Sequence, residues 1–256
     1  MVPLPAGGED DDTFVGRSTL AKIFGTGFDI TANNFPRIDA YAQGGSDNRA
    51  YLYDSSGNDV FTGGAKFSYL FGTDFANYAR GFERVDAYAT SGTDKTNFND
   101  SSGDDDYVGR STKGVLSGSG FLSAAHNFAM YDVFFEQNGT DLAKLFDSVG
   151  NDKYHSQDDI GVLAGSGFRH SIRNNIEAIQ VFGGAGGTDT VEATVIKDLD
   201  TVFGSGNLFR LNRNNSRDED ITDFQTVNAT AEDGHTPVAN VGAVDYVFNQ
   251  FETWTP

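Results

Sequence analysis

Aspartates recur in short turns along the chain, and their type and spacing fit metal binding. The hexapeptide Asp-Ser-Ser-Gly-Asn-Asp at 54–59 returns in close variants at 100–105 and 147–152. A further Asp precedes each turn by six or seven residues. Hard cations such as Ca²⁺ bind about six to eight oxygens, and a glycine-bearing turn brings several carboxylates together. The candidate metal ligands are Asp47, Asp54, Asp59, Asp94, Asp100, Asp105, Asp141, Asp147 and Asp152.

A second interpretation of these turns needs no metal. Asp side chains also accept hydrogen bonds from the N–H groups of their own turn. A counterion is favoured for the whole array, because a formal net charge of −19 makes a compact fold repel itself. We therefore predict Ca²⁺ as a cofactor and keep the hydrogen-bonded turn as the alternative.

A series of aromatic side chains forms the next candidate site. The segment Val85-Asp-Ala-Tyr-Ala89 has counterparts that begin at residues 38, 131 and 179. If Val85 and Ala87 point inward, strand alternation points Tyr88 outward. An outward row of rings beside acidic residues suits sugar faces, whose C–H groups pack on aromatic rings. Coverage of this face by a later strand is the alternative. The candidate ligand-binding rings are Tyr41, Tyr88, Phe134 and Phe182.

Catalytic residues would break the repeat, because chemistry is needed once while a scaffold recurs. His170 lies with Arg169 and Arg173 in the densest basic cluster of the chain. Together with Tyr154 or Asp158, this cluster fits a lyase or epimerase in which a base removes the C5 proton of a uronic acid. The alternative is variable surface decoration, and we predict no catalytic residue. The histidines that break the repeat are His126, His155, His170 and His235.

Composition and charge exclude several classes of partner and site. The chain has 18 Lys and Arg against 37 Asp and Glu, so counterion release cannot drive binding to nucleic acid or to an anionic membrane. It has no Cys, which excludes disulfides and thiolate metal sites. No apolar run approaches the length of a membrane span, so we predict no membrane insertion.

The chain is a tandem repeat. Besides the Asp turn, an Ile-Phe-Gly-Thr-Gly-Phe motif at 23–28 returns near residues 70, 116 and 163. The markers keep one order, which predicts a single repeat domain over 1–256 with atypical terminal units. A short start without a leader-like segment suggests a piece of a longer array. The approximate repeat units are 7–53, 54–99, 100–146, 147–197 and 198–256.

These repeats predict an all-β fold. Alternation in Ala50-Tyr-Leu-Tyr-Asp54 places Ala50 and Leu52 on one inward face. The pattern favours a parallel β-solenoid of about five units of 46–48 residues, with two coils in each unit. A five-bladed β-propeller is the alternative, because five units are a natural number for ring closure.

The Asp turns resemble the calcium-binding nonapeptide repeats of the repeats-in-toxin family. Gly57-Asn-Asp-Val-Phe61 and Gly150-Asn-Asp-Lys-Tyr154 match the second half of that motif. The spacing departs from the family, since the motif occurs once in 46 or 47 residues here and every nine residues there. The whole unit is similar to repeats of very large secreted or surface proteins of bacteria, which implies an extracellular location and a structural or adhesive role.

Two functional hypotheses remain. The first is a non-catalytic structural or adhesive module of a secreted or cell-surface protein, stabilised by Ca²⁺ at its Asp turns and able to bind a polysaccharide or cell-surface partner. The second is a β-helical polysaccharide lyase or uronic-acid epimerase. A deep groove that gathers His170 and Arg173 with a tyrosine would favour the enzyme, and a regular surface would favour the module.

Overall fold

The protein is described by a computed structural model, which covers residues 2–3, 10–136, 138–214 and 216–254. The expected start of the first repeat at residue 7 lies outside these residues. All regular structure in them is β-strand. Nothing in the described chain forms a helix that could cross a membrane.

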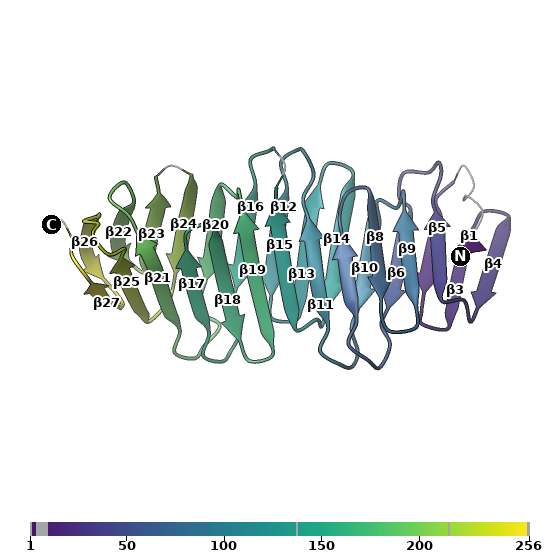
Figure 1. Cartoon of the computed structure of the whole chain (residues 1–256), viewed down its shortest axis with the longest axis horizontal. Helices are drawn as coiled ribbons and strands as arrows, with labels where there is room; N and C mark the ends of the chain where they lie inside the picture. The colour runs from purple at the N-terminus through teal and green to yellow at the C-terminus, as the bar shows by residue number, and fades with distance from the viewer. Residues whose placement is uncertain (1, 4–9, 137, 215, 255–256) are drawn as a thin grey trace. The chain divides into compact units, whose positions relative to one another are not determined.

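The chain folds into two compact bodies. The N-terminal body comprises Met1–Asp105 and Thr112–Asp132, and the C-terminal body comprises Asp106–Ser111 and Val133–Pro256. These bodies do not follow the repeat boundaries, because the repeat at 100–146 contributes strands to both. Figure 1 shows the strands of each body running side by side.

The strands of the N-terminal body are β1 (Val2–Pro3), β2 (Thr13–Gly16), β3 (Leu20–Gly25), β4 (Phe28–Asn33), β5 (Arg37–Tyr41), β6 (Arg49–Tyr53), β7 (Val60–Gly63), β8 (Phe67–Phe71), β9 (Ala76–Arg80), β10 (Arg84–Tyr88), β11 (Lys95–Asn99), β13 (Lys113–Gly118) and β14 (Phe121–His126). Strand β15 (Met130–Phe135) has residues in both bodies. The strands of the C-terminal body are β12 (Asp106–Arg110), β16 (Leu142–Phe146), β17 (Lys153–Gln157), β18 (Ile160–Gly165), β19 (Phe168–Asn174), β20 (Ala178–Phe182), β21 (Thr190–Ile196), β22 (Thr201–Gly206), β23 (Leu208–Arg213), β24 (Arg217–Thr222), β25 (Thr226–Ala231), β26 (Val238–Val244) and β27 (Val247–Phe251).

Parallel pairing between successive coils builds the fold. In the N-terminal body β2 pairs with β6 and β6 with β10, so that Phe14 lies opposite Ala50 and Ala50 opposite Val85. In the C-terminal body β16, β20 and β24 pair in the same way. The predicted all-β parallel solenoid is therefore confirmed, with about six turns.

An antiparallel three-stranded meander is the feature that the sequence did not predict. Strands β7, β8 and β9 pair antiparallel in one sheet, whereas β2, β3 and β4 do so in the other sheet of the same body. The C-terminal body repeats this alternation with β17–β19 and β22–β24. Two strands of each repeat extend the meander within one sheet and do not complete a second coil. The chain therefore forms about six turns in total, and the predicted two coils in each repeat are wrong.

The core follows the predicted alternation. Ala50 and Leu52 of β6 are fully buried, and Tyr51 between them is half-buried. The aromatic residue that follows each Asp turn is fully buried in every repeat in which it occurs, as Phe61, Tyr107 and Tyr154 show. Burying such a ring contributes about 1.5–3 kcal/mol by removing apolar surface from water, so these recurring rings stabilise the interior of each repeat.

Candidate functional site

Three Asp side chains converge in the N-terminal body where two successive coils meet. Asp54 directly follows β6, Asp59 precedes β7, and Asp94 precedes β11, the strand that pairs with β7. One carboxylate oxygen of each lies within 4.8 Å of the others. Asp59 and Asp94 are buried, and Asp54 is nearly so. The structure thus brings Asp94 to the Asp turn of the preceding coil, not to the turn that follows it in sequence.

Hydrogen bonds fix this triad in place. The Ser55 N–H and Oγ–H both donate to Asp59 Oδ2 at 2.8 Å, as the metal-free interpretation of the turn expects. The Asp59 N–H donates to Asp94 Oδ1 at 2.8 Å across the two coils. Thr90 donates to Asp54 through its N–H and its hydroxyl. Turn hydrogen bonds and a gathered set of carboxylates therefore coexist.

A second triad occupies the corresponding place in the C-terminal body. It consists of Asp147, Asp152 and Asp189, with ligand oxygens within 4.8 Å of one another. Ser148 donates to Asp152, and the Asp152 N–H donates to Asp189 Oδ1 at 2.8 Å. Asp189 was not among the predicted ligands. Its signal was present in the sequence, because Gly187-Thr-Asp189 repeats the Gly92-Thr-Asp94 of the first triad.

A glycine allows each triad to form. A Cβ on Gly92 would lie 2.1 Å from the Gly57 carbonyl oxygen, and one on Gly187 would lie 2.0 Å from that of Gly150. Both glycines also have positive φ, at 106° and 90°. Only glycine permits this backbone conformation and this close approach between coils, so the Gly-Thr-Asp segment holds its Asp against the neighbouring turn.

Carboxylates in both triads have raised pKa values. Burial, together with the charges of Asp54 and Asp59, raises the pKa of Asp94 to about 6, although a hydrogen bond from the Asp59 N–H acts in the opposite direction. Burial, and then the neighbouring carboxylates, also raise the pKa of Asp147 and of Asp189. Asp189 is fully shielded from solvent, and its Oδ2 accepts no hydrogen bond from the protein. A buried anionic oxygen without a partner costs several kcal/mol unless a proton or cation meets it.

The other predicted ligands lie elsewhere. Asp47 is exposed and forms an ion pair with Arg49 at 2.6 Å, which lowers the pKa of Asp47. Asp100 follows β11 in the N-terminal body, where Asp105 accepts hydrogen bonds from the Ser101 N–H and hydroxyl. Asp141 belongs to the C-terminal body and is buried. Of the predicted ligands, the two triads gather Asp54, Asp59, Asp94, Asp147 and Asp152.

The four predicted rings do not form one ladder. Tyr41 on β5 and Tyr88 on β10 lie in different sheets of the N-terminal body, and Phe134 on β15 and Phe182 on β20 lie in different sheets of the C-terminal body. The reason is that successive repeats exchange the roles of the two sheets. Tyr41 is exposed, whereas the other three are half-buried.

Shorter aromatic stacks exist instead, and those that include Tyr88 and Phe182 join neighbours in the parallel ladder. Tyr88 stacks between Tyr53, at 5.2 Å between ring centroids, and His126, at 4.5 Å. The Arg17 guanidinium lies 3.9 Å from the centroid of the Tyr53 ring. In the C-terminal body Phe182 stacks on Phe146 at 4.9 Å. Tyr88 and Phe182 thus take part in outward stacks, but with partners that were not predicted.

The histidine of the enzyme hypothesis lies in the core. His170 is fully buried, and its Nδ1 lies 2.7 Å from the Tyr107 hydroxyl. Burial lowers the pKa of His170 to about 4. Tyr154 is also fully buried. A base sealed from solvent cannot meet a polysaccharide, so His170 and Tyr154 have no access to the substrate that the hypothesis requires. Asp158, the other candidate of that cluster, is exposed.

A buried charged network surrounds Tyr154. Its hydroxyl donates to Glu219 Oε2 at 2.6 Å, and Ser156 donates to Glu219 Oε1 at 2.7 Å. The guanidinium groups of Arg213 and Arg217 also donate to Oε1. Coulombic attraction by the two arginines lowers the pKa of Glu219 despite its burial, so the carboxylate is ionised. Sequence reasoning missed this network.

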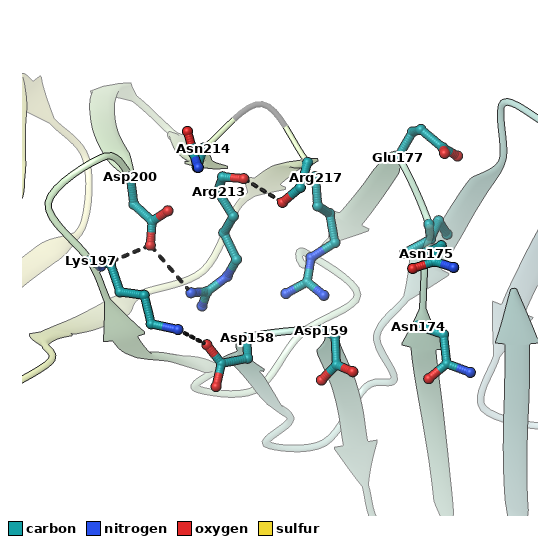
Figure 2. Close-up of a pocket in the computed structure, with 12 residues that line it drawn as sticks. Asp158, Asp159, Asn174, Asn175, Glu177, Lys197, Asp200, Arg213, Asn214 and Arg217 are labelled. Atoms are coloured by element: carbon teal, nitrogen blue, oxygen red, sulfur yellow. Dashed lines mark hydrogen bonds and ion pairs between the residues drawn. The ribbon is translucent and has the colours of Figure 1, made fainter. Parts of the chain in front are cut away.

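The same arginines line a polar pocket of about 450 Å³, shown in Figure 2. It lies where the turns after β17 and β19, the β21–β22 turn and the β23–β24 hairpin meet. Lys197 forms an ion pair with Asp158 at 2.8 Å, and Arg213 lies 3.8 Å from Asp200. The charged and amide residues that line it are Asp158, Asp159, Asn174, Asn175, Glu177, Lys197, Asp200, Arg213, Asn214 and Arg217.

Comparisons of the chain with models of protein families, with curated proteins and with solved structures give no match.

Proposed function

We propose that the protein is a non-catalytic structural or adhesive repeat module of a secreted or cell-surface protein, in which Ca²⁺ links successive coils at the Asp triads. The observation that carries this proposal is the buried Asp189 oxygen without a donor, inside a triad built from two coils. In this proposal the solenoid is the scaffold, and part of the negative charge of the chain serves to bind Ca²⁺ at the triads.

The residues of the triads fit a hard cation. Ca²⁺ takes oxygen ligands at about 2.3–2.6 Å, mixes carboxylates with carbonyls and water, and tolerates irregular geometry. Three carboxylates within 4.8 Å of one another provide a core of such ligands. Burial, and then the mutual repulsion of the carboxylates, raise the pKa of Asp94 and Asp189, and a bound cation would remove that repulsion.

Partner binding is the second half of the proposal. The stack of Tyr53, Tyr88 and His126 presents flat rings along one sheet, with Arg17 beside it and Asp86 bonded to His126 at 3.0 Å. Rings beside charged groups suit a polysaccharide or another cell-surface partner, because sugar C–H faces pack on rings while hydroxyls bond to the charges. This stack replaces the predicted four-ring ladder as the candidate surface.

A calcium titration tests the proposal. We expect the chelated protein to melt at a lower temperature, since a ligand at 100 times its dissociation constant stabilises the folded state by about 2.7 kcal/mol per site. Calorimetry should find two sites in the intact chain and one in Asp189→Asn. Asp233→Asn, an exposed control, should keep both.

Calcium-independent melting together with no binding heat would contradict the proposal. The hydrogen-bonded turn would then account for the recurring aspartates, and the triads would share protons instead of a cation.

A further inference from the structure

The pocket of Figure 2 belongs to a place where the repeat is broken. The second residue after the buried ring is Gly16, Gly63 or Gly109 in three repeats, and the core residue that lies against it is Asn77, Ser123 or His170, none with a formal negative charge. At the fourth such position the glycine is replaced by Ser156 and the core residue against it is Glu219, which requires Arg213 and Arg217 beside it. A buried ion network is seldom more stable than an apolar core of the same volume, so stability does not explain this exception.

Backbone strain accompanies the exception. Val195 has a φ of 56°, in the left-handed region that β-branched residues avoid. The strain coincides with an irregularity in the pairing of β21 with β25, between Ala193 and Ile196. Arg213 donates to the carbonyl oxygens of Thr194 and Val195, at 3.1 and 3.2 Å, and so holds the distorted strand. Strain that is held by a specific side chain is typical of binding sites.

Hydrogen bonds within the protein hold the two arginines of the pocket wall in place without a ligand. Arg213 bonds to Glu219, Ser156 and two backbone carbonyls, and Arg217 bonds to Glu219 at 2.8 Å. Both arginines are almost fully buried. A rigid arginine loses little conformational entropy when it binds a ligand, which makes such a wall suited to recognition.

The charges of the lining select the chemistry of the ligand. Four carboxylates, Asp158, Asp159, Glu177 and Asp200, oppose three cations, Lys197, Arg213 and Arg217. In Figure 2 the Arg217 guanidinium is directed toward the side of the pocket on which Asp158 and Asp159 lie. Against the effect of burial, the charge of Glu219 and, to a smaller extent, that of Asp159 raise the pKa of Arg217. A group placed between Asp159 and Arg217 must donate to a carboxylate and accept from a guanidinium, and a hydroxyl does both. The three cations are already paired, Arg213 and Arg217 with the buried Glu219 and Lys197 with Asp158, so they give no advantage to an anionic ligand.

We propose that this pocket binds a neutral saccharide. Vicinal hydroxyls match its alternating carboxylate, amide and guanidinium groups, and about 450 Å³ falls in the size range of small-molecule sites. Asp159 and Asn175 are exposed at its rim and accept or donate to hydroxyls, while Arg217 donates from the wall. This site is distinct from both Asp triads and requires no calcium.

Saturation-transfer NMR on the full chain tests the proposal, with glucose, galactose, mannose and N-acetylglucosamine as probes. We expect transfer to at least one of them at about millimolar affinity, equally in calcium and in chelator. Asp159→Ala and Asn175→Ala should each weaken binding about tenfold, because each removes hydrogen bonds to hydroxyls. Galacturonate and glucosamine, the charged probes, should bind more weakly than their neutral counterparts.

Asp233→Ala, an exposed acid away from the pocket, is the matched control and should bind like the parent. No transfer to any neutral sugar would overturn the proposal, as would transfer that persists unchanged in both rim variants. A preference for galacturonate or glucosamine would overturn the neutral class. The calcium titration reports separately on the triads, so either proposal can fail alone.

Discussion

Tyr107 and Tyr154 occupy the same place in successive repeats, yet their hydroxyls meet different partners. Tyr107 bonds to His170, which burial keeps neutral because its pKa falls to about 4. Tyr154 bonds to an ionised Glu219 that two arginines neutralise. The scaffold therefore needs a filled position beneath the ring, and it tolerates a neutral or a charged group there. The charged version is accompanied by the pocket of Figure 2 and by the strained Val195 of β21.

Removing the charge of Glu219 should have the largest effect. Glu219→Gln leaves Arg213 and Arg217 without their buried counterion, which should lower the free energy of unfolding by about 3–5 kcal/mol. Urea unfolding followed by circular dichroism measures it. Glu232→Gln, on a partly exposed residue, is the control and should change stability by less than about 0.5 kcal/mol. A small loss in Glu219→Gln would mean that the network is not the buried ion cluster described above.

Acid should destabilise the Tyr107 position next most strongly. The pKa of His170 is about 4 in the folded protein and about 6.5 when unfolded, so between these values only the unfolded chain takes up the proton. Stability from this group is fully present above pH about 6.5 and falls as the pH drops toward 4, by about 3 kcal/mol at most. The slope should be weaker in His170→Asn, which copies Asn77. Parallel curves for the two proteins would show that His170 titrates normally.

Paired Tyr→Phe variants should have the smallest effects and compare the two positions directly. Tyr154→Phe removes a hydrogen bond to an ionised acceptor and should cost about 1.5–3 kcal/mol. Tyr107→Phe removes a neutral bond and should cost about 0.5–1.5 kcal/mol, because Phe61 already fills the equivalent place in another repeat. Equal costs in urea unfolding would erase the distinction between the positions.

The repeat period predicted much of the fold but not its topology. Alternation at Ala50 and Leu52 gave the inward face correctly, since local pattern alone decides which face of a strand is buried. The meander could not be predicted in the same way. A hairpin and a crossover both begin with a turn, and whether the next strand pairs locally or with the next coil depends on competition among distant strands.

The candidate sites were predictable to a similar degree. The Asp turns identified most of each triad, because the residues lie within one segment. The third ligand comes from the following coil. Its Gly-Thr-Asp segment can be recognised in the sequence at 92–94 and 187–189, but its contact with the preceding Asp turn becomes visible only once β7 is known to pair with β11 and β17 with β21. The Glu219 network left one faint signal, which is Ser156 at a position that holds Gly63 and Gly109 in other repeats.

The exchange of sheets between neighbouring repeats has a consequence for how such a chain can grow. A meander lies in one sheet for β7–β9 and in the other for β2–β4, so any surface feature encoded once in every repeat returns to the same side only in every second one. Duplication of a single repeat would therefore turn every later decoration to the opposite side. Duplication of a pair would leave them in place, so pairs are the units by which an array of this kind can lengthen while keeping its binding surfaces on one side.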